Sequence, residues 1–128
     1  MKIQKNSPDR RKDKRFKLKD PVFALMYFSP TMMGRVTDIS RSGAAVRYVK
    51  SGDGYRELNQ LDIFKSDFKL YIENIKAKTI SDMEIIDKTF IGSKEIRRCG
   101  IQFEVLSNNQ LSQLENFIQD FASAESLI

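Results

Sequence analysis

At 128 residues, of which 41% are hydrophobic, the chain is long enough to build one hydrophobic core but hardly two, and we expect a single domain. It contains no histidine and one cysteine, so it lacks the commonest general base, the commonest nitrogen ligand of metals and any internal disulfide bond. These absences argue against an enzyme and against a metal site. The meaning of the net charge of +5 depends on where the basic residues lie along the chain.

The basic charge is concentrated at the N-terminus. Residues 1–20 contain nine of the 22 basic residues and three of the 17 acidic ones, which leaves the rest of the chain close to neutral. Residues 1–19 lack apolar periodicity, and Ser7-Pro8-Asp9 would interrupt a helix. We therefore predict a flexible basic arm over residues 1–19 and one folded domain over residues 20–128.

The N-terminus shows neither the apolar stretch nor the small-residue cleavage site of a secretory signal. The longest apolar run, Val22–Phe28, is far shorter than the roughly 20 residues needed to cross a bilayer. We expect a cytoplasmic protein without a membrane span.

From Pro21 onward, short apolar runs alternate with turn-forming residues, which is typical of an all-β domain. The clearest alternation places Cys99, Ile101, Phe103 and Val105 on one face, so we predict a central strand with Cys99 as a core thiol. Six predicted strands suffice for a small antiparallel barrel, which removes exposed edges. The six are Val22–Phe28, Arg35–Ile39, Ala44–Val49, Phe68–Glu73, Ala77–Ile86 and Arg98–Val105.

The last segment changes to helical spacing. Ser107 to Gln110 has the form of a capping box, and apolar residues at Leu111, Leu114, Phe117, Ile118 and Phe121 then follow one helical face. The sequence predicts one C-terminal amphipathic helix over residues 108–123, packed on the end or flank of the barrel.

Three carboxylates lie close together at the end of the fifth predicted strand: Asp82, Glu84 and Asp87. Paired carboxylates can act in acid–base catalysis. A solvated strand end and its turn explain these three more simply, so we assign no catalytic residue.

Two arginines of the basic arm, Arg11 and Arg15, can converge on one ligand if the backbone curves between them. Each guanidinium offers a planar fork of donors that suits a phosphate or the O6 and N7 atoms of guanine. The alternative is a solvated charge run, which is the commoner explanation for an isolated basic segment.

A second motif, formed by Asp38, Ser40 and Gly43, lies where one predicted strand gives way to the next. Asp38 can accept hydrogen bonds from N1 and N2 of guanine, and Ser40 adds a hydroxyl. Gly43 permits a positive φ or the close approach of a ligand. The alternative is an ordinary hairpin turn, which favours the same residue types.

Together, Arg-x-x-x-Arg and the later Asp-x-Ser-x-x-Gly resemble the PilZ family of cyclic di-GMP receptors. The resemblance extends from Arg10 to about Phe121 and includes Gly100-Ile101-Gln102-Phe103 in a late strand. It implies a PilZ-like barrel in which Arg11 and Arg15 bind guanine and phosphate, while Asp38, Ser40 and Gly43 form the other half of the pocket. Arg10 and Arg41 are candidates for extra phosphate contacts.

The sequence also departs from the family. The segment Ser51–Ser66 is longer and more polar than the family's compact connection and lacks its usual proline, so we interpret it as a surface that faces a partner.

We expect a bacterial receptor for cyclic di-GMP, a monomer or weak dimer without a cofactor, that regulates motility or biofilm formation. Ligand binding would order the arm over the barrel and change the surface seen by an unidentified protein. One alternative is a nucleic-acid-binding barrel in which Phe16, Tyr27 or Tyr48 stacks on bases, although we expect no nucleic-acid partner. Another is a scaffold that acts through protein contacts.

Overall fold

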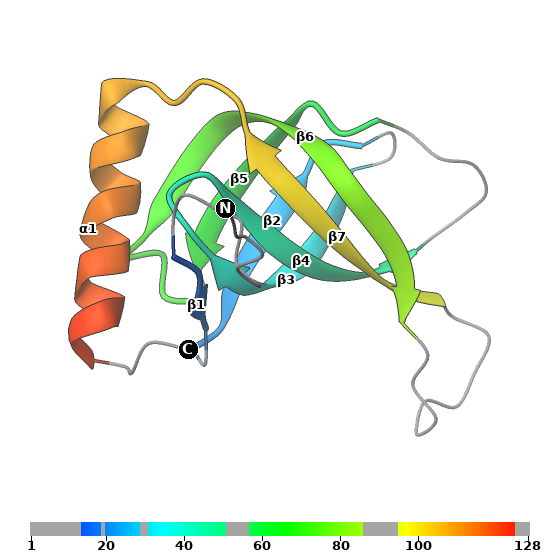
Figure 1. The fold of residues 1–128 in the computed structure, drawn as a ribbon, viewed down its shortest axis with the longest axis horizontal. Coiled ribbons are helices and arrows are strands. Elements are labelled where there is room, and N and C mark those ends of the chain that lie inside the picture. Colours follow the sequence, from blue (N-terminus) through cyan, green and yellow to red (C-terminus); the bar gives the residue numbers. More distant parts are fainter. Residues whose placement is uncertain (1–13, 19, 29–30, 51–56, 86–94, 125–128) are drawn as a thin grey trace, which may run out of the picture.

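The computed structural model describes residues 14–18, 20–28, 31–50, 57–85 and 95–124, and the side chains of these residues as far as residue 120. Together they form a closed antiparallel β-barrel with an added strand and one C-terminal helix (Figure 1). The elements are β1 (Phe16–Lys17), β2 (Val22–Met26), β3 (Met32–Ile39), β4 (Gly43–Lys50), β5 (Gln60–Lys65), β6 (Tyr71–Ile85), β7 (Glu95–Phe103) and α1 (Asn108–Ala124).

Strand β3 closes the barrel because it pairs with β2 along its first half and with β4 along its second half. Arg35 is opposite Phe23 of β2 and Arg47 of β4, and Ile39 is opposite Ala44. The strands follow the order β3-β2-β5-β6-β7-β4, after which β4 returns to β3, and all pairings are antiparallel. The predicted six-stranded antiparallel barrel is confirmed.

The end of the predicted arm packs against the barrel. Phe16 and Leu18 are buried, and Leu18 donates a backbone hydrogen bond to the Thr37 carbonyl at 3.0 Å. Strand β1 pairs with the end of β3, where Lys17 is opposite Asp38. Residues 1–13 and 19 lie outside the described residues, so the flexible arm stays a prediction there.

The set of barrel strands differs from the predicted set. The second half of the fourth predicted strand and the fifth predicted strand as far as Ile85 belong to the single strand β6, and the alternation of β6 is interrupted at Asn74, a residue with a φ of 59°. Strand β5 lies inside Ser51–Ser66, which we had interpreted as a polar connection. A bulge between Leu61 and Ile63 buries three consecutive residues there, including Asp62, and this conceals the period of two.

Two residues predicted to face the core, Phe68 and Val105, are exposed instead. Phe68 lies in the turn between β5 and β6 and has a φ of 60°, and Val105 follows the end of β7. Both lie outside the regular strand, so the alternation does not extend to them. The other predicted core residues of these two segments are buried as expected: Leu70, just before β6, and Ile72, Cys99, Ile101 and Phe103 within the strands.

The helix begins with the predicted capping box. Ser107 and Gln110 exchange backbone-to-side-chain hydrogen bonds of 2.9 and 3.0 Å. Leu114 and Ile118 are buried with the barrel core, and α1 packs along one side of the barrel near the start of β6 (Figure 1). The helix, predicted over residues 108–123, is therefore confirmed. No helix among the described residues is long and apolar enough to span a membrane.

Candidate functional site

Asp38 stands at the centre of a charged cluster on the barrel surface. Its carboxylate is largely buried and accepts from two arginines, one on each oxygen: Arg15 Nη1 lies 2.6 Å from Oδ1, and Arg98 Nη2 lies 3.1 Å from Oδ2. Asp38 takes this position because β3 is irregular between Val36 and Asp38. The cluster therefore joins β3, β7 and the residue before β1.

Arg15 is held more tightly than an arginine of a solvated arm. Its side chain is 17% exposed, and its Nε is buried without a hydrogen-bond partner among the described residues. A buried donor without an acceptor costs free energy, about 1–3 kcal/mol for a typical group. Arg15 thus retains a donor that an incoming acceptor could satisfy.

Ser40 organises the turn between β3 and β4. Its Oγ accepts from the backbone amides of Ser42 and Gly43, each at 3.2 Å, and its own amide donates to the Gly43 carbonyl at 2.8 Å. The side chain is buried. Such local bonds are the reason why serine favours turns. In this structure the Ser40 hydroxyl shapes the loop beside Asp38.

Gly43 is required by a neighbouring strand. It pairs with Gln102 of β7, and a Cβ at residue 43 would lie 2.2 Å from the Ile101 carbonyl oxygen. The φ of Gly43 is not in the positive range, so the suggestion of a left-handed conformation was wrong. The close approach that glycine allows here is between β4 and β7, the strands that adjoin Asp38 and carry Arg98.

Arg98 is the site residue that sequence reasoning missed. It lies on the outward face of β7, is 40% exposed, and is separated from Asp38 by 60 positions in the chain. The alternation around Cys99 placed Arg98 facing outward. Its pairing with Asp38 depends on the register of β7 against β4, which the sequence pattern does not supply.

The remaining predicted site residues are not part of this cluster as described. Arg41 is 55% exposed and forms an ion pair of 2.5 Å with Glu115 of α1, so it points toward the helix. Arg10 and Arg11 lie outside the described residues.

A second charged cluster lies on the opposite face of β7, around Asp82. Its two carboxylate oxygens accept from Arg97 Nε and the Tyr48 hydroxyl, both at 2.8 Å, and Arg97 also pairs with Glu95. The interpretation of Asp82 as part of a solvated strand end was therefore wrong, because the side chain is only 11% exposed. Asp87 lies outside the described residues.

Burial and the bond to Asp82 raise the pKa of Tyr48, and the two carboxylates raise the pKa of Arg97. Burial also raises the pKa of the Cys99 thiol to about 11, which agrees with its prediction as a core residue. Among the described residues, no group of three or more cysteine and acidic side chains is arranged to hold a metal ion.

Compared by sequence, the chain matches no protein-family model and no curated protein. Compared by structure, it is similar to YcgR of Escherichia coli in complex with c-di-GMP, with a TM-score of 0.68 and 19% identity over 91% of this chain and 47% of that one. It is also similar to the c-di-GMP complex of K. pneumonia MrkH, with a TM-score of 0.70 and 18% identity over 91% of this chain and 54% of that one. The chain thus spans about half the length of these two proteins.

The isolated PilZ domain of E. coli YcgR gives the corresponding domain-level comparison. It has a TM-score of 0.63 and 18% identity, and the match covers 93% of this chain and 100% of that domain. The chain is a closed β-barrel with an added strand, a C-terminal helix and a charged surface cluster. Its fold is that of a PilZ domain, as the two sequence motifs had indicated.

Proposed function

We propose that the chain is a receptor that binds cyclic di-GMP at the cluster of Arg15, Asp38 and Arg98. The observation that carries this proposal is the Asp38 carboxylate, which lies between two guanidinium groups on the surface of a PilZ-fold barrel. YcgR and MrkH, whose folds are similar, have been solved in complex with that nucleotide.

Guanine fits this cluster by its chemistry. One edge offers the N1 and N2 hydrogens, which a carboxylate accepts, and the other offers O6 and N7, which an arginine fork donates to. The bond of 2.6 Å between Arg15 and Asp38 can be exchanged for these two contacts with the base. Arg98, which lies at the same cluster and is 40% exposed, can then pair with a phosphate, and the unpartnered Arg15 Nε is a further donor.

Ser40 and Gly43 contribute by shaping the site in this proposal. Ser40 fixes the turn that follows Asp38, and Gly43 allows β4 to approach β7, the strand of Arg98. Arg11 stays assigned to the ligand by the Arg-x-x-x-Arg motif, with Arg10 as an auxiliary contact.

The consequence of binding is a changed surface rather than a chemical reaction. Neutralising the basic residues before β1 would allow them to order over the barrel, where a downstream protein would recognise them. MrkH is described as a c-di-GMP-dependent transcription regulatory factor, and a regulatory role of that general kind is what we propose here. The wider expectation is control of motility or biofilm formation.

Isothermal titration calorimetry with cyclic di-GMP tests the proposal. Wild-type protein should bind one ligand or a stacked pair, whereas Asp38→Ala and Arg15→Ala should lose binding. Lys76→Ala, which removes an exposed cation of β6, is the matched control and should bind as the wild type does. Absence of heat with the wild-type protein would contradict the proposal.

The nucleic-acid alternative is weakened by the environment of its three aromatic residues. Phe16 and Tyr48 are buried, and the Tyr27 hydroxyl donates to Asp62 at 2.8 Å. Titration with GMP and with single-stranded DNA belongs in the same experiment. Binding of DNA that weakens steeply with salt and survives Asp38→Ala would favour the alternative.

A further inference from the structure

A continuous row of side chains crosses five strands on the outward face of the barrel. Successive cross-strand partners are Arg47 of β4, Arg35 of β3, Phe23 of β2, Phe64 of β5 and Tyr71 of β6. We call this set the arginine–aromatic row. With strands about 4.8 Å apart, it is roughly 19 Å long. One end is cationic, and the other is aromatic.

The aromatic end carries a projecting side chain. Phe68 stacks on Phe64 with ring centroids 5.7 Å apart and an interplanar angle of 7°, yet it is 65% exposed. Its positive φ is a conformation that bulky residues rarely adopt. The turn is held by the Phe68 amide, which donates to the Lys65 carbonyl, and by the Lys69 amide, which donates to Asp67. The ring is therefore fixed in an outward position.

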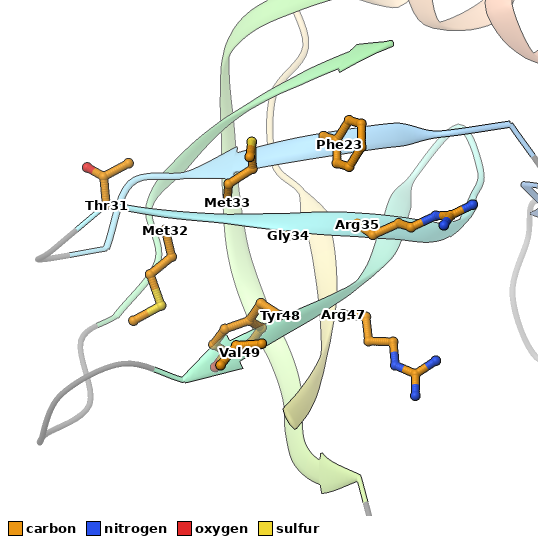
Figure 2. A pocket seen from close by; sticks show the side chains of 9 residues that line it. All are labelled: Phe23, Thr31, Met32, Met33, Gly34, Arg35, Arg47, Tyr48 and Val49. Carbon is orange, nitrogen blue, oxygen red and sulfur yellow. The ribbon is translucent and has the colours of Figure 1, made fainter. Parts of the chain in front are cut away.

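The cationic end carries a hollow. The paired register of β3 and β4 stops at Arg35 and Arg47, and beyond that point a cavity of about 420 Å³ opens between the strands (Figure 2). Met33 and Val49, both exposed, line it together with these two arginines. Phe23 also lines the cavity and contacts Phe64, so it connects the two ends of the row.

We propose that the arginine–aromatic row is a self-association surface, on which a second copy of the chain binds around a twofold axis near Phe23. A twofold axis brings opposite ends of the same patch together. Phe68 of each copy then enters the hollow of the other, where Arg35 and Arg47 lie against its ring in cation–π contact. The projecting ring, the hollow and the opposite chemistry of the two ends of the row are complementary under this symmetry.

The ring geometry favours this occupant over single-stranded nucleic acid. The rings of Phe64, Phe68 and Tyr71 stack on one another with centroids 5.6 to 6.4 Å apart. Rings that already stack on one another offer few free faces on which successive bases could stack. Exposed aromatic residues beside arginines are also the composition of protein interfaces.

The first test is sedimentation velocity on the full chain, from about 10 μM to about 1 mM, the range in which weak dimers form. The wild type should pass from monomer to dimer. Phe68→Ser and Arg47→Glu should each raise the dissociation constant about tenfold or more, as loss of a central contact does. Val105→Ser, which removes another exposed apolar residue, is the matched control and should dimerise as the wild type does.

The second test fixes the orientation of the two copies. Lys69→Cys places a thiol beside Phe68, and Val49→Cys places one in the hollow. The native Cys99 is fully buried and should not compete with them. Under mild oxidation, an equimolar mixture should form mixed dimers, whereas either variant alone should form few. Equal cross-linking in all three samples would overturn the proposed arrangement.

The proposal does not depend on the ligand. Phe68→Ser should bind cyclic di-GMP like the wild-type protein, so loss of dimerisation and loss of ligand binding can be told apart. A wild-type chain that stays monomeric throughout the range overturns the proposal. A monomer that binds oligothymidylate through Phe68 overturns it as well, and assigns the surface to nucleic acid.

Discussion

Two neighbouring arginines of β7, Arg97 and Arg98, each bind an aspartate, but they do so on opposite sides of the strand. Successive side chains of a strand face opposite ways. Arg97 accordingly joins Asp82 and the buried Tyr48, whereas Arg98 joins Asp38 on the outer surface. Two arginine–aspartate pairs thus start from adjacent arginines of β7 but lie in different environments.

The two clusters differ in how completely their donors are used. Each nitrogen of the Arg97 guanidinium has a partner: Nε donates to Asp82 Oδ1, Nη2 donates to the Asp82 backbone carbonyl, and Nη1 pairs with Glu95. At Asp38, Arg15 and Arg98 each donate one bond, and the Arg15 Nε lacks a partner among the described residues. The Asp82 cluster therefore has the form of a structural contact. The Asp38 cluster has the form of a binding site, because it retains a hydrogen-bond donor without a partner among the described residues.

The largest expected effect is the loss of ligand binding when Asp38 is replaced. Asp38→Ala should weaken binding of cyclic di-GMP by about 100-fold or more, because it removes two charge-assisted bonds to guanine of about 1.5–3 kcal/mol each. Calorimetric titration measures the loss. Asp82→Ala, if folded, should keep the wild-type affinity, and an equal loss in both variants would erase the distinction between the clusters.

The next largest effect is on the free energy of unfolding, which should fall more when Arg97 is replaced than when Arg98 is replaced. Arg97→Ala should lower the free energy of unfolding by about 2–3 kcal/mol, because it leaves the Asp82 carboxylate largely buried without its cation. Arg98→Ala, at a more exposed position, should cost less than about 1 kcal/mol. Urea unfolding at neutral pH compares them. Equal losses of unfolding free energy would show that the two clusters contribute equally to stability.

A smaller effect should appear at high pH. The pKa of Tyr48 is raised in the folded chain, so its neutral form is favoured there and its contribution is complete below about pH 10, the ordinary tyrosine value. As the pH rises above 10, the unfolded chain loses this proton first, and stability falls. Urea unfolding between pH 9 and pH 11 should therefore show a shallower decline in Tyr48→Phe than in the wild type. Identical slopes would contradict a role for Tyr48.

The smallest effect is expected at Arg41. Its ion pair with Glu115 is exposed on both sides, and such pairs contribute about 0–1 kcal/mol. Arg41→Ala should change the affinity for cyclic di-GMP by less than about twofold, since the side chain points toward α1. A larger loss, measured by the same titration, would extend the site along the β3–β4 turn.

Much of the fold could be predicted because the patterns of its elements are local. The capping box at Ser107 and the alternation around Cys99 each depend on a few adjacent residues, and both appear in the structure as expected. Strand β5 was missed for a physical reason. The bulge at Asp62 allows a charged residue to be buried, and its carboxylate is satisfied by Tyr71, the Asn74 amide and Tyr27, which lie 9, 12 and 35 positions away in the chain.

The candidate site was predictable only in part for the same reason. Asp38, Ser40 and Gly43 form a contiguous motif, whereas Arg98 reaches Asp38 through the register of β7 against β4. The ligand-binding roles predicted for Ser40 and Gly43 stay predictions. A turn serine and a glycine can serve a ligand or the backbone equally well, and only the contact with Ile101 identifies a backbone role for Gly43.

The tight contact between Gly43 and Ile101 has an energetic consequence for recognition. Gly43 lets β4 lie close to β7, and β4 in turn pairs with Asp38 of β3, so the ladder of β3, β4 and β7 sets the separation of Asp38 and Arg98. In the proposed site, ligand binding would therefore order few barrel residues, and more of the contact energy would be retained as affinity. Rigidity in the strand pair is therefore a form of preorganisation for recognition.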